Sequence, residues 1–226
     1  MATHRTAEEI LKEQIDSMGN EFGSIYNRVY REVIFIHHKW SEFESLYGQG
    51  DIPIQSMNKF APFFFYIVQN NLFDDVILSI CRITDPIKSL GKYNITIQLF
   101  PEYVDEEIRS SISQQVACII SDSSFCRDRR NRIISHIDKE LALNQSAKLL
   151  EPANRNSVNT LLKKIQELIN SIEQYYFDSE VYFGFARPEG HSVLKWAEEG
   201  LKLDELKWKF LETGKLDASD FDTNED

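Results

Sequence analysis

The feature that most constrains this chain is the spacing of its apolar residues, which recur at intervals of three and four. The clearest stretch runs from Phe22 to Tyr47, and others run from 64 to 83, from 108 to 119 and from 158 to 175. Such spacing places apolar side chains on one face of a helix that packs against other helices. The chain has only nine glycines and six prolines in 226 residues, whereas strand-rich folds need many turn residues. We therefore predict an all-α protein, an up-and-down helical bundle without a substantial sheet.

Local signals predict where the helices begin and end. Thr6 and Glu9 form a capping box, so a first helix begins near residue 7. The Asp85-Pro86 pair stops a helix, because a residue before proline is disfavoured in the helical conformation. The second, third and fourth helices are expected over residues 22–47, 61–85 and 102 to about 121. A fifth helix carries the arginines and His136 and ends near residue 143, a sixth runs from Asn156 or Ser157 to about 175, and a last one spans 192–211. A break is expected at 48–53 and a connector over 87–101.

Composition predicts three parts and a location. We expect a bundle over residues 1–185, a helical appendage over 186–212 and an acidic disordered tail over 213–226, which holds five acids and one base. The net charge of −11 argues against a general nucleic-acid coat protein. No run of about 18 apolar residues is present, so we expect no membrane helix. The charged N-terminus lacks the apolar region of a signal peptide, which predicts a cytoplasmic protein.

Several classes of site are not supported by the sequence. The few glycines form no phosphate-binding loop, and no H-E-x-x-H motif is present. His38 and Glu42, one helical turn apart, could share a metal, but no second pair accompanies them, so we favour a solvated or partly packed pair. Cys81, Cys118 and Cys126 are odd in number and lack C-x-x-C spacing, which predicts buried free thiols. We expect no metal and no cofactor.

One segment combines groups that suit phosphate chemistry. Residues 127–132 hold four arginines and one aspartate, a local charge of +3, and His136 follows within two helical turns. A histidine can take or give a proton near neutral pH, and guanidinium groups can stabilise charge on phosphate oxygens. The alternative is a basic helix face that pairs with acidic surface groups. Composition alone favours this alternative.

The same segment resembles the motif of HEPN domains, an arginine followed by a polar residue and, after four to six residues, a histidine. Here Arg130 and Asn131 precede His136, with five residues between the arginine and the histidine. The run "RNRIISHID" is similar to the motif of the AbiU-type abortive-infection branch of that superfamily. Residues 74–86, "DDVILSICRITDP", and 92–100, "KYNITIQLF", resemble its preceding helix and connector. The resemblance covers roughly residues 60–143.

The resemblance implies a HEPN-like bundle, here with extra N-terminal and C-terminal helices. It further implies a metal-independent endoribonuclease that acts in phage defence or as a toxin. His136 would be the general acid or base, Arg130 would hold the scissile phosphate, and Asn131 would orient the site. The neighbouring arginines would bind RNA: Arg127, Arg129 and Arg132.

Geometry and family properties leave alternatives open. On a regular helix, Arg130 and His136 lie about 120° apart, so they would converge only at a helix start, at a kink or across a dimer axis. The motifs of the family commonly meet across a homodimer, which we therefore expect. Asp138 stands where one HEPN variant has a tyrosine, so that variant's nucleotidyltransferase antitoxin is in doubt. Three readings remain: a ribonuclease, an inactive HEPN module that binds RNA or an antitoxin or other defence protein, and an unrelated bundle with a basic face.

Overall fold

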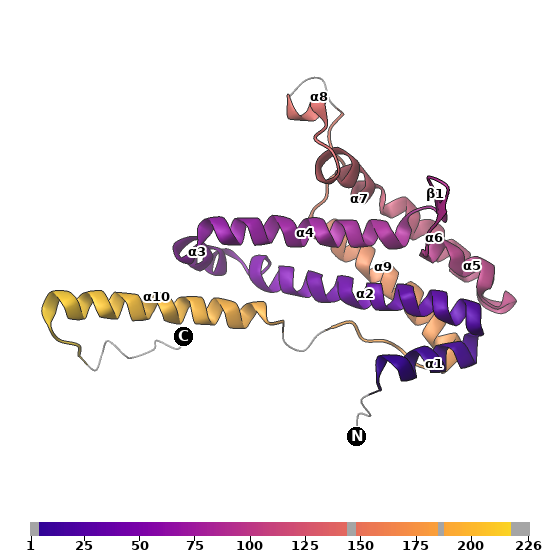
Figure 1. The fold of residues 1–226 in the computed structure, drawn as a ribbon, viewed down its shortest axis with the longest axis horizontal. Coiled ribbons are helices and arrows are strands. Elements are labelled where there is room, and N and C mark those ends of the chain that lie inside the picture. Colours follow the sequence, from indigo (N-terminus) through magenta and orange to yellow (C-terminus); the bar gives the residue numbers. More distant parts are fainter. Residues whose placement is uncertain (1–4, 144–147, 185–187, 218–226) are drawn as a thin grey trace. The chain divides into compact units, whose positions relative to one another are not determined.

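The computed structural model describes residues 5–143, 148–184 and 188–217, and within these ranges the regular secondary structure is helical apart from one short hairpin (Figure 1). The prediction of an all-α protein is confirmed. The elements are α1 Ala7–Met18, α2 Asn20–Tyr47, α3 Asp51–Phe60, α4 Pro62–Thr84, β1 Lys88–Ser89, β2 Lys92–Tyr93, the 3-10 turn η1 Ile97–Leu99, α5 Phe100–Tyr103, α6 Glu106–Asp122, α7 Ser124–Arg129, the π-helical turn η2 Arg130–Ile134, α8 Lys139–Ala142, α9 Arg155–Phe177 and α10 Gly190–Thr213.

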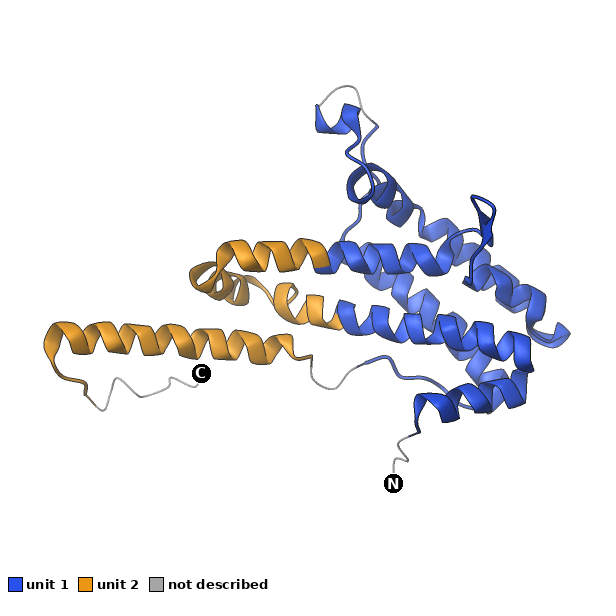
Figure 2. Cartoon of the chain, in the orientation of Figure 1, with its two compact units in different colours: residues 1–40, 72–184 blue, residues 41–71, 185–226 orange. Residues whose placement is uncertain are grey.

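The chain divides into two compact units (Figure 2). The first consists of residues 1–40 and 72–184, and the second of residues 41–71 and 185–226. The expected division into a bundle over 1–185, an appendage over 186–212 and a disordered tail remains a prediction. Residues 218–226 of that tail lie outside the described residues.

The core of the first unit is formed by the apolar faces of α2, α4, α6 and α9. Along α2 the residues spaced at threes and fours are buried as the periodicity predicts, and α6 packs along α9. Two side-chain hydrogen bonds join α2 to α9. The Tyr26 hydroxyl donates to Glu173 Oε1 at 2.6 Å, and Trp40 Nε1 donates to Asn159 Oδ1 at 2.5 Å. The fully buried core side chains include Tyr26, Ile36, Ile77, Ile80, Ile97, Phe100, Ile112, Ile119, Leu161, Ile165, Leu168 and Ile169.

Gly23 lets α1 approach α2 closely. A Cβ atom at this position would lie 2.7 Å from both the carbonyl oxygen of Gln14 and the Cα of Ile15. Nearby, the buried Asn27 amide donates to Gln14 Oε1 at 2.8 Å. The capping box predicted at Thr6 is present and begins α1.

The second unit is organised around the packing of α10 on α3. The Ser56 hydroxyl donates to Glu198 Oε1 at 2.9 Å. The Glu42 carboxylate accepts hydrogen bonds from the backbone N–H groups of Glu189 and Gly190, at 2.8 and 2.7 Å. These are N–H groups that the first turn of a helix leaves without intrahelical partners, so Glu42 caps α10.

Two expectations about the region of residues 48–72 were wrong. Residues 51–60 form α3 instead of continuing the break, with Gly50 at φ 96° before the helix and Pro53 in its first turn, where proline is tolerated. At the start of α4, Phe64, which the spacing places on the apolar face, is 59% exposed, and Phe65 is buried instead. The neighbouring Phe63 is also exposed, so the three-four pattern fails at the start of α4, whereas Val76, Ile80 and Ile83 of the same pattern are buried as predicted.

The connector after α4 is more structured than expected. Strands β1 and β2 pair antiparallel, and Lys88 lies opposite Tyr93. The two residues of the turn, Leu90 and Gly91, both have positive φ, as hairpin turns of the primed types require. After the hairpin the Thr96 side chain caps η1, and α6 begins at Glu106 rather than near Glu102.

Other details of the first unit also differ from expectation. The cap of α9 is Asn154, whose side chain accepts from Ser157 N, rather than Asn156 or Ser157. Cys81 and Cys126 are buried free thiols as predicted, but Cys118 is exposed. Burial raises the pKa of Cys81 to about 11. In the described ranges no helix is both long enough and apolar enough to span a membrane.

Candidate functional site

The fifth predicted helix is interrupted where the motif begins. Helix α7 is anchored by the buried Phe125 and Cys126 and ends at Arg129. The next residues form the π-helical turn η2, closed by a hydrogen bond of 2.8 Å from Ser135 N to the Arg130 carbonyl. His136 follows this turn and lies outside any helix. The expectation of one regular helix through His136 was therefore wrong, and the 120° separation derived from it does not apply. Single π-turns are frequent at functional sites.

Arg130 is held at its base by the end of α4. Its Nη1 donates to both carboxylate oxygens of Asp85, at 2.8 and 2.9 Å, and its Nε donates to Asn131 Oδ1 at 3.1 Å. Burial lowers the pKa of Arg130, but the hydrogen bonds and charge of Asp85 outweigh it, so the net shift is upward. Among the described residues no partner accepts from Nη2. The guanidinium group is thus a fixed cation with one nitrogen left to bind a ligand.

Asp85 is itself fixed by the connector. The side-chain amide of Gln98 donates to the backbone carbonyls of Thr84 and Asp85, both at 3.0 Å. These carbonyls lie at the C-terminal end of α4, where a helix leaves acceptors without partners. Gln98 therefore fixes the backbone that carries the Asp85 carboxylate toward Arg130.

The other three arginines are engaged within the chain. Arg127 donates to Ser123 Oγ at 2.9 Å and to the Ile120 carbonyl. Arg129 pairs with Asp74 at 2.8 Å and lies over the Phe73 ring. Arg132 contacts two carboxylates, Asp128 at 3.6 Å and Asp138 at 3.3 Å. Four aspartates, Asp74, Asp85, Asp128 and Asp138, thus lie beside the four arginines of the segment. The local charge of +3 seen in the sequence is therefore largely balanced in the fold. The RNA-binding roles of Arg127, Arg129 and Arg132 remain predictions.

His136 is exposed at the surface of the first unit. Within the part of the chain that the structure describes, its side chain makes no hydrogen bond or ion pair, with Arg130 or with any other residue. Two residues later, Asp138 accepts from Leu141 N at 2.9 Å and caps α8. That backbone hydrogen bond and, after it, Arg132 hold the pKa of Asp138 below its usual value. Of the three predicted site residues, Arg130 and Asn131 are therefore hydrogen-bonded to each other. The His136 side chain is exposed and lies near them in the sequence.

Asp85 is the site residue that the sequence reasoning did not assign. Its only signals were the helix stop at Asp85-Pro86 and its place at the end of the segment that resembles the AbiU-type branch. Neither signal says that its carboxylate faces a motif 45 residues later. Two neighbouring aspartates of α4 have different partners: Asp74 pairs with Arg129 at 2.8 Å, and Asp75 pairs with Lys39 at 2.5 Å.

The histidines of α2 do not form part of this site. The His37 ring stacks on Phe183 with centroids 4.6 Å apart, and burial lowers its pKa to about 4. The side chain of Glu42, considered as a partner of His38, is used to cap α10. In the residues described, no three histidine, cysteine or carboxylate side chains group in a way that could hold a metal ion.

Comparison with known proteins identifies the family. The model of the HEPN family AbiU2 matches residues 19–196, which include α2 to α9 and the first turns of α10. A search of curated proteins gives no match, and neither does a search of solved structures. The match includes the segment with Arg130 and His136 and extends beyond the region in which the sequence showed the resemblance. The chain therefore belongs to the AbiU2 family of HEPN proteins.

Proposed function

We propose that this protein is a metal-independent endoribonuclease of the abortive-infection or toxin type, which acts in phage defence in the cytoplasm. The observation that carries the proposal is the arrangement of Arg130: a guanidinium group held by Asp85 and Asn131, with Nη2 unbonded, on the turn that leads to an exposed histidine. A fixed cation beside a titratable base suits the cleavage of a phosphodiester.

The proposed reaction uses the nucleophile that RNA itself supplies. His136 removes the proton from a ribose 2′-hydroxyl, whose oxygen attacks the adjacent phosphorus. The bond from phosphorus to the 5′-oxygen breaks, which leaves a 2′,3′-cyclic phosphate and, after protonation of the leaving oxygen, a 5′-hydroxyl. Arg130 Nη2 donates to a phosphate oxygen as negative charge develops there. Because the attacking hydroxyl belongs to the RNA, the reaction needs no metal-bound water, and DNA is not a substrate.

The reaction needs two proton transfers, from the 2′-hydroxyl and to the leaving 5′-oxygen, but the motif of one chain holds a single histidine, His136. A homodimer that brings two copies of the motif together would supply a second His136, so that one acts as base while the other acts as acid. We propose such a composite site. The exposure of His136 and of Ile137, which is 87% exposed, is consistent with a surface that a second chain covers.

A second candidate is an inactive HEPN module that binds RNA or a defence or antitoxin partner protein. The balance of four arginines by four aspartates favours it, because groups engaged within the chain are less free to stabilise a transition state. The test is incubation of the purified protein with total RNA in the presence of EDTA, beside a His136→Ala variant. Fragmentation by the wild type alone supports the nuclease. Intact RNA in both samples favours the binding module, and equal fragmentation in both refutes the assignment of the site.

A further inference from the structure

A hollow in the first unit lies directly behind the Arg130 partner. It has a volume of about 350 Å³ and is lined by α2, by the end of α4 and by the hairpin that follows, and Asp85 is one of its walls. The same carboxylate accepts from Arg130 Nη1. The Asp85 side chain therefore connects the hollow to Arg130, the residue proposed to bind the phosphate. Its volume is within the usual range of ligand pockets, about 300–1,000 Å³.

The lining of this hollow combines an apolar floor with an exposed aromatic ring. Val29 and Ile83 lie at the floor and are themselves almost fully buried. Tyr93 stands at the rim with 77% of its surface exposed, and the Lys88 ammonium lies 5.3 Å from its ring centroid. In the ranges that the structure describes, no other aromatic ring stacks on Tyr93. An exposed ring beside an apolar floor offers a flat surface on which a planar group can stack.

Hydrogen bonds hold the hairpin that carries this ring. Asn94 Nδ2 donates to the Pro86 carbonyl at 2.8 Å and to Ser89 Oγ at 3.0 Å, and Asn94 N donates to the Ile87 carbonyl at 2.8 Å. Asn94 also lines the hollow, and its Oδ1 atom accepts no hydrogen bond from any residue in the described ranges. The ring of Tyr93 and this amide oxygen are thus presented in a defined position.

The remaining wall carries charged donors and acceptors. Arg82 pairs with Glu32 at 2.6 Å, and Arg28 lies 3.7 Å from the same carboxylate. Both arginine side chains are more than half exposed, and Lys88 lies beside Tyr93, so three cations accompany the two carboxylates of the lining, Glu32 and Asp85. An anionic strand could therefore pass along the rim while a planar group enters the hollow.

We propose that this hollow binds a nucleobase of the RNA strand whose phosphate is held by Arg130. Single-stranded RNA is recognised by stacking of bases on aromatic side chains and by hydrogen bonds to base edges. Here Tyr93 would stack on the base, and Asn94 and Glu32 would meet its edge. Arg28 and Arg82 would contact flanking phosphates. The inference rests on the proposed function, because it takes RNA as the substrate and makes the hollow the element that selects the nucleotide beside the cut.

The test is a binding measurement that does not depend on cleavage. A fluorescent 2′-O-methyl oligoribonucleotide of about eight nucleotides, within the site sizes of single-strand binders, cannot be cut because its 2′-oxygen is blocked. Tyr93→Ala should weaken its binding about 5- to 150-fold, the range found when a stacking side chain is removed, whereas Tyr93→Phe should bind like the wild type. Because Tyr93 contacts no phosphate, the slope of affinity against salt concentration should not change.

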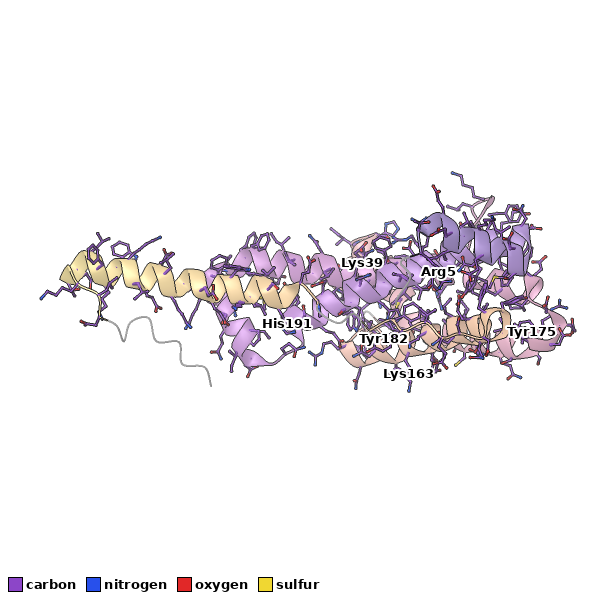
Figure 3. All side chains as sticks on the ribbon, turned by 90° about the horizontal axis from the view of Figure 1, so that it is seen from below. Arg5, Lys39, Lys163, Tyr175, Tyr182 and His191 are labelled. Atoms are coloured by element: carbon purple, nitrogen blue, oxygen red, sulfur yellow. The ribbon has the colours of Figure 1, made fainter. Side chains whose placement is uncertain are left out.

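A matched control is available in the same unit. Tyr182, labelled in Figure 3, is 84% exposed and is not one of the residues that line the hollow, so Tyr182→Ala removes an exposed tyrosine without affecting the site. A second readout is photo-crosslinking with an iodouridine-containing probe, which should modify Tyr93 but not Tyr182. This control separates loss of the pocket from a general loss of surface aromatic groups.

The outcomes distinguish this inference from the proposed function. Binding that depends on Tyr93 without any cleavage of natural RNA supports the pocket and counts against the nuclease. Cleavage of natural RNA together with equal affinities for Tyr93→Ala, Tyr182→Ala and the wild type supports the nuclease and overturns the pocket. Failure of the wild type to bind the blocked oligonucleotide at low salt also overturns the pocket.

Discussion

Replacing Asp85 by asparagine should make the protein less stable and a better binder of RNA. In the wild type the Asp85 carboxylate accepts two hydrogen bonds from Arg130 Nη1, and both side chains are about one quarter exposed, at 27% and 24%. Asparagine keeps one oxygen that can accept from Nη1 but removes the negative charge. The variant therefore loses the ionic part of the contact, and the charge of Arg130 is no longer balanced where Nη2 meets the phosphate.

The expected loss of stability follows from this geometry. Exposed ion pairs contribute about 0.2–1 kcal/mol, and hydrogen bonds to charged groups about 1.5–3 kcal/mol. A pair of this partial burial that keeps one hydrogen bond should lose roughly 1 kcal/mol. For a chain of this size that corresponds to a fall in Tm of about 2–4 °C, which calorimetry can measure.

The expected gain in RNA binding comes from the charge of Arg130, which Asp85 no longer balances. Arg130 binds the same phosphate in both proteins, but in the variant one more counterion is released, which steepens the dependence of log affinity on log salt concentration by about 0.7 for a single strand. At low salt the affinity should rise about fivefold, equivalent to ~1 kcal/mol. Fluorescence anisotropy with the uncleavable oligonucleotide, repeated over a range of salt concentrations, gives both quantities.

Asp75→Asn is the matched control. It removes the same charge from α4, the helix that ends directly before Asp85, but its partner is Lys39 rather than an arginine of the motif. The salt slope of Asp75→Asn should equal that of the wild type. If Asp85→Asn also shows the wild-type slope and affinity, then Arg130 is not a phosphate ligand whose charge Asp85 balances, and the reasoning about the site fails.

Three further predictions concern catalysis, pH and packing. His136→Ala should lower the cleavage rate about 10²–10⁴-fold, and Arg130→Lys should recover little of the activity lost in Arg130→Ala, because lysine lacks the planar fork; single-turnover kinetics measures both. Burial raises the pKa of Glu173, so the folded state binds its proton more tightly than the unfolded state, and stability falls as pH rises from the usual value of 4.5 through the raised pKa. Glu173→Gln should therefore have a higher Tm than the wild type at neutral pH, and the difference in Tm should vanish below about pH 4.5. A difference in Tm that persists at acid pH would contradict the raised pKa of Glu173. Gly23→Ala should lower the free energy of unfolding by about 1–3 kcal/mol, because its Cβ would meet backbone atoms of α1. Gly200→Ala should be neutral or stabilise α10 by up to about 1 kcal/mol, since its Cβ would meet only a ring carbon at 3.9 Å. Urea unfolding of both variants tests the difference.

The periodic helices of this protein could be predicted from the sequence because burial alone determines their pattern. Along α2 every apolar residue at the three-four spacing is buried, and in α9 only the last of them, Tyr175, is substantially exposed. The exposed Phe64 lies where apolar residues are too dense for the spacing to mark one face, and the unexpected α3 lies where they are too few to form a stripe. There the fold depends on contacts that a periodic pattern does not contain.

The site could be predicted only in part. The sequence identifies Arg130, Asn131 and His136 by their spacing, but the π-turn that separates them depends on a hydrogen bond between residues five apart, from Ser135 N to the Arg130 carbonyl. The charge of the segment was also misleading, because its partners Asp74, on α4, and Asp85, directly after α4, are far away in the sequence. Distant ion pairs of this kind leave no local pattern.

The central claim is that the Arg130–His136 segment cleaves RNA through the 2′-hydroxyl. The most direct measurement uses an oligonucleotide of DNA that contains a single ribonucleotide, incubated in EDTA and analysed by mass spectrometry. The account predicts one cut, directly 3′ of the ribose, with a 2′,3′-cyclic phosphate on one product and a 5′-hydroxyl on the other, and no cut by His136→Ala. Cleavage at deoxyribonucleotides, products with a 5′-phosphate, or the same products from His136→Ala would contradict it.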